Sequence, residues 1–243
     1  NGQGLVPPLL GRLPDLSLGL LLEAVPGPDL DHLILAAARQ GDWAPLGSGL
    51  EKLARLLAIF HSRPVPISPV SADPALVYLD KLMAQLQEAG LLTHADRQTL
   101  ASERAAWQDR FGDFGDRQVL IHGDATPTNF LFPEGRAVAL DLERLRLGDR
   151  LWDLSWLAGE LKHAWGWRTG NPHGAEEAIG HFFRAYLAAA HLEPALIRRV
   201  YGLNPLYMAL AELRIARNLY LTRDYRRELV AEARRCLTHG RRL

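Results

Sequence analysis

Cysteine is almost absent from this sequence, and neither sign of charge dominates it. Cys236 is the single cysteine among 243 residues, which excludes an internal disulfide framework and is typical of a reducing compartment. The 28 basic side chains balance the 28 acidic ones, so no overall field would recruit nucleic acid or an anionic membrane. No apolar run approaches the length of a transmembrane helix, and no basic-then-apolar leader opens the chain. We therefore expect a cytoplasmic protein without a membrane span.

Apolar residues are abundant, at 48% of the chain, which is enough for one large or two small domains with a real core. Leucine-rich stripes at helical spacing predict that most of the chain is helical. The expected helical segments are 50–61, 76–86, 94–111, 150–165, 174–191 and 194–238, with breaks near 170–172, 193–194 and 204–205.

The most informative segment starts at His122 and reads His-Gly-Asp-Ala-Thr-Pro-Thr-Asn. Its Asp124 is followed five residues later by Asn129, and a second carboxylate, Asp141, comes twelve residues after that. Kinases need such a set, because a base must orient the acceptor hydroxyl and two oxygen ligands must hold the Mg²⁺ that bridges the ATP phosphates. We interpret Asp124 as the base, and Asn129 and Asp141 as the Mg²⁺ ligands.

Apolar segments on both sides of this motif predict strands. Residues 119–121 lead into the motif, and residues 130–132 and 137–140 follow it as a hairpin around a Pro-Glu-Gly turn. The hairpin would return Asp141 toward Asn129, so that both side chains can face one metal site.

Taken singly, each of these residues has a structural alternative. Asp124 could close an Asx turn with its own backbone, Asn129 could be a turn residue, and Asp141 could cap the end of a strand. The combined spacing favours the catalytic interpretation. Asp141 also follows four apolar residues, at the point where a buried strand would emerge.

This spacing resembles the catalytic loop of the protein-kinase-like superfamily, in its small-molecule branch of aminoglycoside and choline kinase type phosphotransferases. Gly123 replaces the Arg of the protein-kinase pattern, and Leu142-Glu143 replaces its Phe-Gly, as in the small-molecule branch. Residues 148–154, Gly-Asp-Arg-Leu-Trp-Asp-Leu, are similar to the G-D-P-x-x-D-L segment of that branch. Arg150 stands in place of the usual Pro.

The resemblance implies an α+β protein-kinase-like fold, with a mostly helical large lobe, short strands and a remnant of the small β lobe. Residues 1–27 would form the remnant and the hinge. Residues 28–243 would form the helical large lobe, which carries the catalytic loop and the acceptor site. Apolar residues 5–10 and 18–25, with a turn near Pro14, predict the two strands of the remnant.

In the resembled family, backbone atoms of the hinge hydrogen-bond adenine. The corresponding main chain here lies around Glu23, Ala24 and Val25, although an ordinary hairpin is an equal interpretation of these residues alone. Leu131, two residues after Asn129, would form the floor of the adenine pocket, a role that is compatible with simple strand packing.

The phosphate clamp of the family has no counterpart in this sequence. A Gly-rich loop, a strand Lys and a helix Glu are expected, but Gly2-Gln3-Gly4 is too short, and Lys52, Lys81 and Lys162 lie in helical patterns after the hinge. The chain begins at Asn1 rather than Met, and the resemblance predicts an earlier lobe. If Asn1 is the true start, ATP affinity and turnover should both be low.

Four residues near the motif are expected to have structural roles. His122 would hydrogen-bond nearby backbone and hold the loop in shape, and His61 would be a satisfied core histidine. Asp149 precedes the segment 150–165 and is a natural N-cap. The resemblance implies that Asp153 braces the catalytic loop from that helix.

The tryptophans and the arginines bear on the acceptor. Trp152 and Trp156 lie four apart on one helix face and predict core packing, which is also favoured for Trp165 and Trp167 over a place in the acceptor pocket. From Glu160 onward basic residues outnumber acidic ones, which favours a neutral or anionic acceptor over a polycationic aminoglycoside. The basic residues of this region include Arg198, Arg199, Arg214, Arg217, Arg226, Arg227, Arg234 and Arg235. Many of these arginines are expected on solvated helix faces.

The sequence therefore predicts an ATP- and Mg²⁺-dependent phosphotransferase whose acceptor is a hydroxyl of a sugar-, aminoglycoside- or amino-alcohol-like small molecule. One alternative is a pseudokinase or binding protein that keeps the large lobe without a competent nucleotide clamp. Another is a metal-dependent phosphoesterase that uses His122, Asp124 and Asp141, for which further metal ligands would be needed.

Overall fold

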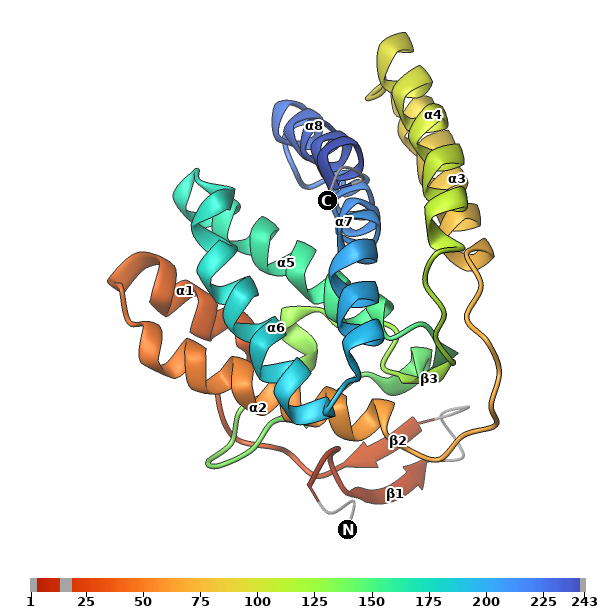
Figure 1. Ribbon diagram of the computed structural model, residues 1–243. Coiled ribbons are helices and arrows are strands. Elements are labelled where there is room, and N and C mark those ends of the chain that lie inside the picture. The colour runs from red at the N-terminus through yellow and green to blue at the C-terminus, as the bar shows by residue number, and fades with distance from the viewer. Residues whose placement is uncertain (1–3, 14–18, 241–243) are drawn as a thin grey trace.

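The computed structural model describes residues 4–13 and 19–240 of the chain. A hairpin near the N-terminus precedes a body of helices (Figure 1). The helices are α1 (Leu30–Gln40), α2 (Trp43–His61), α3 (Asp73–Glu88), α4 (His94–Phe111), α5 (Leu151–Thr169), α6 (Glu176–Ala190), α7 (Pro194–Ile215) and α8 (Arg223–Gly240). The strands are β1 (Leu9–Leu13), β2 (Gly19–Leu22), β3 (Val119–Ile121), β4 (Phe130–Leu131), β5 (Val138–Ala139) and β6 (Arg146–Gly148). The mostly helical architecture with short strands confirms the predicted α+β class.

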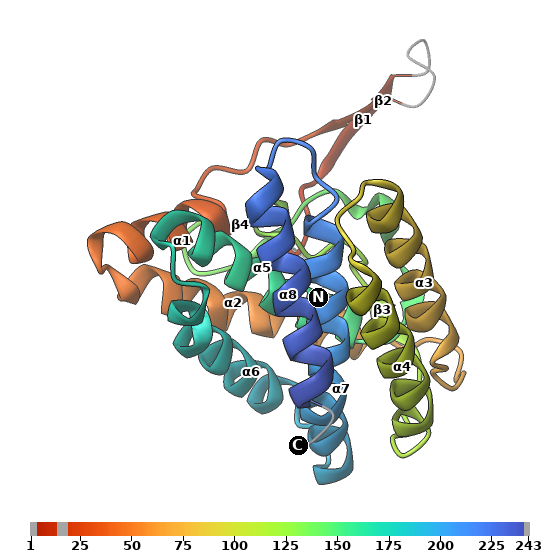
Figure 2. The same cartoon turned by 90° about the horizontal axis from the view of Figure 1, so that it is seen from above.

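Strands β1 and β2 form an antiparallel hairpin that extends away from the helices (Figure 2). Its strands expose between 45% and 61% of five leucines, Leu9, Leu10, Leu20, Leu21 and Leu22. The predicted strand 5–10 is wrong in its bounds, because proline has no N–H to donate and the ladder starts only after Pro8. The predicted strand 18–25 is reduced to β2, and the turn expected near Pro14 lies outside the described residues.

Helix α5 occupies the centre of the helical body. It packs against α1, α6 and α7, while α7 also packs against α3 and α8, and α2 lies along α6. Buried residues occur on all sides of α5, as expected of a helix that other elements enclose. Because α5 carries Asp153 and Glu160, and α7 carries Arg199 and Arg214, the packing of these two helices positions four charged side chains.

Helices α5 and α7 lie close together at Gly159. A Cβ built on Gly159 would lie 2.6 Å from the Cβ of Ala211. Such a separation is well below van der Waals contact, so a larger residue at position 159 requires the two helices to move apart.

Helix α7 continues through Pro205, although the sequence predicted a break at this proline. Proline removes one helical hydrogen bond. Leu203 and Leu206 on either side of it are fully buried, and this packing keeps the segment helical. The predicted segment 194–238 is divided instead at residues 216–222, between α7 and α8. The predicted segment for α4, in contrast, coincides with the helix.

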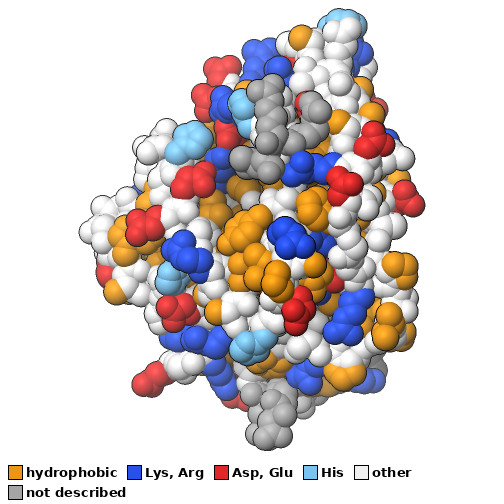
Figure 3. Space-filling model, viewed as in Figure 1, with side chains coloured by type: hydrophobic (Ala, Val, Ile, Leu, Met, Phe, Trp, Pro, Cys, Tyr) orange, Lys and Arg blue, Asp and Glu red, His pale blue; other side chains and the backbone are white. Residues whose placement is uncertain are grey.

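The surface carries charges of both signs. Figure 3 shows basic and acidic side chains spread together over one face of the molecule, in agreement with the zero net charge of the sequence. Within residues 4–13 and 19–240, none of the helices is long and apolar enough to cross a membrane.

We expect Gly159→Ala to destabilise the protein by about 1–3 kcal/mol, because the added methyl group overpacks the contact between α5 and α7. Gly47→Ala in α2 is the matched control. The nearest atom to its added Cβ, Nε2 of His181, lies 3.8 Å away, so this variant should gain roughly 0.5–1 kcal/mol from helix propensity. Urea unfolding of both variants measures the difference, and equal effects would contradict the close helix contact.

Candidate active site

The strand predicted before the motif and the hairpin predicted after it are both present. Strand β3 leads into the loop and pairs with β6, and a 3₁₀ turn at Pro127–Asn129 leads into β4. Strand β4 pairs with β5 so that Phe130 lies opposite Ala139. The Leu140 N–H then donates to the Asn129 carbonyl over 2.9 Å. The hairpin therefore brings the backbone just before Asp141 against Asn129.

The Asn129 amide has a defined orientation. Its Nδ2 donates to the backbone carbonyl of Asp124 over 3.0 Å, and this hydrogen bond joins the start of the loop at Asp124 to its end at Asn129. Among the described residues, no donor is bonded to its Oδ1. A neutral oxygen held in this way is the type of hard ligand that Mg²⁺ accepts.

Asp141 adopts a left-handed backbone conformation, with φ of 52° and ψ of 61°. This region is uncommon for residues other than glycine, and such conformations concentrate at functional sites. The exposed Asp141 side chain makes no capping hydrogen bond to the 3₁₀ turn Leu142–Arg144 that follows it.

The Asp124 carboxylate lies between two guanidinium groups. Its Oδ1 accepts a hydrogen bond from Arg214 Nη2 over 3.2 Å, and its Oδ2 lies 3.8 Å from Arg144 Nε. Arg214 also donates through Nη1 to Glu160 Oε1 over 2.7 Å. Arg144 and Arg214 were not identified as site residues from the sequence, because no motif distinguishes them from arginines on solvated faces.

His122 is buried, and both of its ring nitrogens are engaged. Its Nε2 lies 2.8 Å from the Leu140 carbonyl, and its Nδ1 accepts from the Asp124 N–H over 3.3 Å. The neutral tautomer with the proton on Nε2 satisfies both contacts. With neither nitrogen free, His122 does not provide the metal ligand that the phosphoesterase alternative requires.

Asp153 lies beneath the loop and is fully buried. It accepts hydrogen bonds from the N–H groups of His122 over 2.8 Å and Gly123 over 2.9 Å. It also lies 3.1 Å from Nε2 of His61. Gly123 has φ of +81°, and a Cβ there would lie 2.4 Å from the Arg144 carbonyl, so the loop needs glycine at this position.

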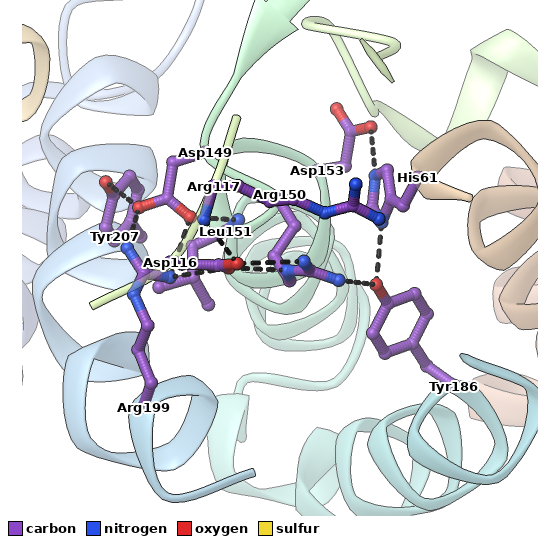
Figure 4. A network of polar contacts seen from close by, with 10 residues as sticks. All are labelled: His61, Asp116, Arg117, Asp149, Arg150, Leu151, Asp153, Tyr186, Arg199 and Tyr207. Atoms are coloured by element: carbon purple, nitrogen blue, oxygen red, sulfur yellow. Dashed lines mark hydrogen bonds and ion pairs between the residues drawn. The ribbon is translucent and has the colours of Figure 1, made fainter. Parts of the chain in front are cut away.

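A buried polar network continues from His61 away from the loop (Figure 4). Nδ1 of His61 lies 2.7 Å from the hydroxyl of Tyr186, which accepts from Arg150 over 3.3 Å. Arg150 in turn donates to both oxygens of Asp116, over 2.7 and 3.1 Å. Burial would lower the pKa of Arg150, but its hydrogen bonds and attraction to Asp116 and Tyr186 outweigh this effect and raise it.

Asp149 belongs to a second branch of this network. Its carboxylate accepts two hydrogen bonds from Arg199, over 2.9 and 2.5 Å, and one from the Tyr207 hydroxyl over 2.7 Å. It also accepts from the Leu151 N–H over 3.1 Å. The N-cap prediction for Asp149 is therefore only partly right: the N-cap position of α5 is Arg150, and most contacts of Asp149 join α5 to α7.

The tryptophans differ in their surroundings. Trp165 is buried against Trp43, with ring centroids 5.0 Å apart, and Trp152 packs against Trp156, with centroids 5.5 Å apart. Packing was predicted for Trp152, Trp156 and Trp165. It was also predicted for Trp167, which is 51% exposed and has its ring centroid 5.2 Å from that of Tyr225.

Glu23 and Val25 line a cavity of about 610 Å³, which we call the hinge cavity. Other parts of its wall are Val6, Pro8, Arg136 and Val138. The Glu23 N–H donates to the Pro8 carbonyl over 2.9 Å, whereas no acceptor among the described residues is bonded to the Val25 N–H. Leu131 is half-buried beside this cavity, since it pairs with Val138 of its wall.

The described residues contain no group of three or more His, Cys, Asp or Glu side chains that could hold a metal ion. The candidate metal site consists instead of one carboxylate, Asp141, and one amide oxygen, that of Asn129. This donor set fits Mg²⁺, which usually completes its coordination with water and substrate phosphates.

Comparison with known proteins identifies the family. Residues 3–203 match the phosphotransferase enzyme family. The chain belongs to this family. Comparison with curated proteins gives no match.

Solved structures of small-molecule kinases share the fold of this phosphotransferase family member. A choline/ethanolamine kinase family protein from Mesorhizobium loti aligns with 98% of this chain and 80% of its own, at 16% identity and a TM-score of 0.64. A glucosamine kinase aligns with 98% of this chain and 66% of its own, at 19% identity and a TM-score of 0.60. An ADP-bound aminoglycoside phosphotransferase aligns with 97% and 77%, at 14% identity and a TM-score of 0.56. The resemblance found in the sequence is thereby confirmed.

The chain is shorter than these relatives. It spans 60% and 59% of the length of two further glucosamine kinase structures, one of which holds glucosamine, ADP and inorganic phosphate.

We expect Arg150→Met to destabilise the protein by about 3–5 kcal/mol, because it removes the main partner of the buried Asp116 carboxylate. The matched control is Arg55→Met, which breaks an exposed pair with Glu51 at 3.9 Å and should cost less than about 1 kcal/mol. Urea unfolding provides both values. A loss for Arg150→Met no greater than that of the control would contradict a role for the buried network.

Glu160 should make the stability depend on pH. Burial raises its pKa from 4.5 to about 7, although Arg214 opposes the shift. The folded protein therefore binds this proton more tightly than the unfolded chain, and the resulting stabilisation is complete below pH 4.5 and is lost as the pH rises to about 7. We expect the melting temperature of the wild type, relative to Glu160→Gln, to fall over this range and to be constant above it. Parallel pH profiles of the two proteins would disprove the shift.

Proposed function

We propose that this chain transfers the γ-phosphoryl group of ATP, with Mg²⁺, to a hydroxyl of a small molecule. The observation that carries the proposal is the catalytic loop itself, in which the Asn129 amide is bonded to the Asp124 backbone and Leu140 is bonded to Asn129. These contacts join the candidate base and the two candidate metal ligands. Membership of the phosphotransferase enzyme family supports the reaction class.

Asp124 would accept a hydrogen bond from the acceptor hydroxyl and orient its oxygen toward the γ-phosphorus. As the new P–O bond forms, the bond from the γ-phosphorus to ADP breaks, and the hydroxyl proton is taken up by Asp124. Phosphoryl transfer asks mainly for such positioning and for charge stabilisation. When bound, Mg²⁺ would neutralise charge on the phosphates, and Asn129 Oδ1 and the Asp141 carboxylate would hold it.

The nucleotide would bind with its adenine in the hinge cavity. The free N–H of Val25 and the carbonyl of Glu23 are available there for the two edges of the base, and Leu131 would lie below it. We accordingly assign residues 1–27 to a small-lobe remnant with the hinge, and residues 28–243 to the large lobe. ADP in the solved structures of an aminoglycoside phosphotransferase and a glucosamine kinase is consistent with a nucleotide site in this fold.

The melting temperature of the chain should rise with the concentration of Mg·ATP, and should rise less with ATP alone, because a ligand that binds only the folded state stabilises it. Asp141→Ala should abolish the Mg²⁺-dependent part of the rise. Asp124→Ala should keep the rise but lose phosphotransfer. The exposed Asp113→Ala serves as the control and should behave like the wild type.

Two outcomes would count against the proposal. Phosphotransfer at the wild-type rate in Asp124→Ala would exclude this residue as the base. A chain that does not respond to Mg·ATP at all would instead favour the pseudokinase or binding-protein alternative.

A further inference from the structure

A cavity of about 340 Å³ adjoins the candidate base, and we call it the arginine cavity. Its charged lining consists of Arg144, Arg214, Arg217 and Glu160, and it is completed by polar side chains that include Thr126, Asn218 and Tyr220. Arg144 and Arg214 are the two residues that flank Asp124. An acceptor hydroxyl that reaches Asp124 would thus place the rest of its molecule among these guanidinium groups.

The Arg217 guanidinium donates only two hydrogen bonds to other described residues. Its Nη1 donates to the Gln85 side chain over 2.8 Å, and its Nε donates to the Arg214 carbonyl over 3.3 Å. No carboxylate among the described residues forms an ion pair with it. A half-buried guanidinium with only neutral partners is well suited to bind an anionic group in a bidentate contact.

The negative charge that faces these arginines is limited. Asp124 carries one negative charge between Arg214 and Arg144, and Glu160 is only partly ionised at neutral pH because burial raises its pKa to about 7. Glu143 is exposed and lies 3.7 Å from Arg144 Nε. His163 also lines the cavity, and burial lowers its pKa to about 4, so it adds no charge at pH 7. The lining therefore keeps an excess of positive charge.

An adjoining cavity of about 330 Å³, which we call the aromatic cavity, contains rings of the type that bind cationic groups. It shares Tyr78 and Arg144 with the arginine cavity and adds Trp152, Trp156 and Arg146. The three rings contact one another with centroids 5.5–6.0 Å apart, as in cages that hold quaternary ammonium groups.

A guanidinium group of the protein already lies over two of these three rings. Cζ of Arg146 lies 5.9 Å from the Trp152 ring centroid, and Cζ of Arg214 lies 5.1 Å from that of Trp156. A ligand ammonium group would have to displace a guanidinium or lie beside one of like charge. This arrangement selects against cationic acceptors.

We propose that the acceptor is an anionic alcohol, whose carboxylate or phosphate binds Arg217 in the arginine cavity while its hydroxyl faces Asp124. The proposal rests on the proposed phosphotransferase function. Its reaction converts the alcohol and ATP into a phosphate ester and ADP, with the hydroxyl proton released. The guanidinium of Arg217 binds the acceptor and takes no part in bond breaking.

The test uses pairs of acceptors that share a skeleton and differ in charge. Glucosamine, glucose, glucuronate and glucose 6-phosphate form one series, and ethanolamine and glycolate form a second. Binding is measured by melting temperature without nucleotide, and transfer by ADP release with Mg·ATP. At least one anionic member should bind and react about ten-fold better than its amine counterpart, and glucuronate against glucose 6-phosphate separates carboxylate from phosphate.

Arg217→Gln should weaken the preferred anion about ten-fold through KM and leave glucose within about two-fold, since it removes one charge-assisted contact. Arg217→Lys should restore part of the preference, because it keeps the charge without the planar fork. Arg227→Gln, at an exposed position on α8, is the matched control and should have no effect.

Three results would overturn the inference: a preference for the amines, no Arg217-dependent preference for any anion, or an Arg217→Gln variant that lowers kcat equally for all acceptors. The last result would place Arg217 at the transferred phosphoryl group. Because anion binding is measured without nucleotide, the inference can fail while Mg·ATP still binds, and the phosphotransferase proposal can fail while Arg217-dependent anion binding persists.

Discussion

The loop that carries the candidate base depends on one buried carboxylate. Asp153 accepts hydrogen bonds from the N–H groups of His122 and Gly123, and its carboxylate also lies 3.1 Å from Nε2 of His61. A buried carboxylate is costly unless it is compensated in this way, and its compensation fixes both the loop and the ring. Helix α5, which carries Asp153, therefore holds the loop that carries Asp124 in its shape.

Arg150 and Asp116 extend this constraint through the core. Arg150 occupies a position where the resembled family usually has proline. Its guanidinium group donates hydrogen bonds to Asp116 and Tyr186, which a proline ring cannot do. The resulting network links α5, α6 and α7 around the loop. Since α7 also supplies Arg214, the same helix packing that supports the loop brings a guanidinium to the candidate base.

Two kinds of group lie near Asp124. The metal ligand candidates Asn129 and Asp141 contribute oxygen atoms, and the Asn129 amide is bonded to the Asp124 backbone. Arg214 and Arg144 lie beside the Asp124 carboxylate, and Arg214 also lies over the Trp156 ring. Oxygen ligands suit a phosphate donor with a metal ion, and guanidinium groups suit an acceptor with a negative group.

Local sequence determined the loop, the β4–β5 hairpin and the extent of α4, because turn residues, apolar runs and helical periodicity act over short distances. The spacing of Asp124, Asn129 and Asp141, together with its resemblance to a kinase loop, also indicated the candidate base and metal ligands. Only the tertiary structure decided three further features: the contact of Asp153 with His61, the persistence of α7 through Pro205, and the approach of Arg214 to Asp124. Residues 90 positions apart meet there through the packing of α5 and α7 around the loop, which no local pattern encodes.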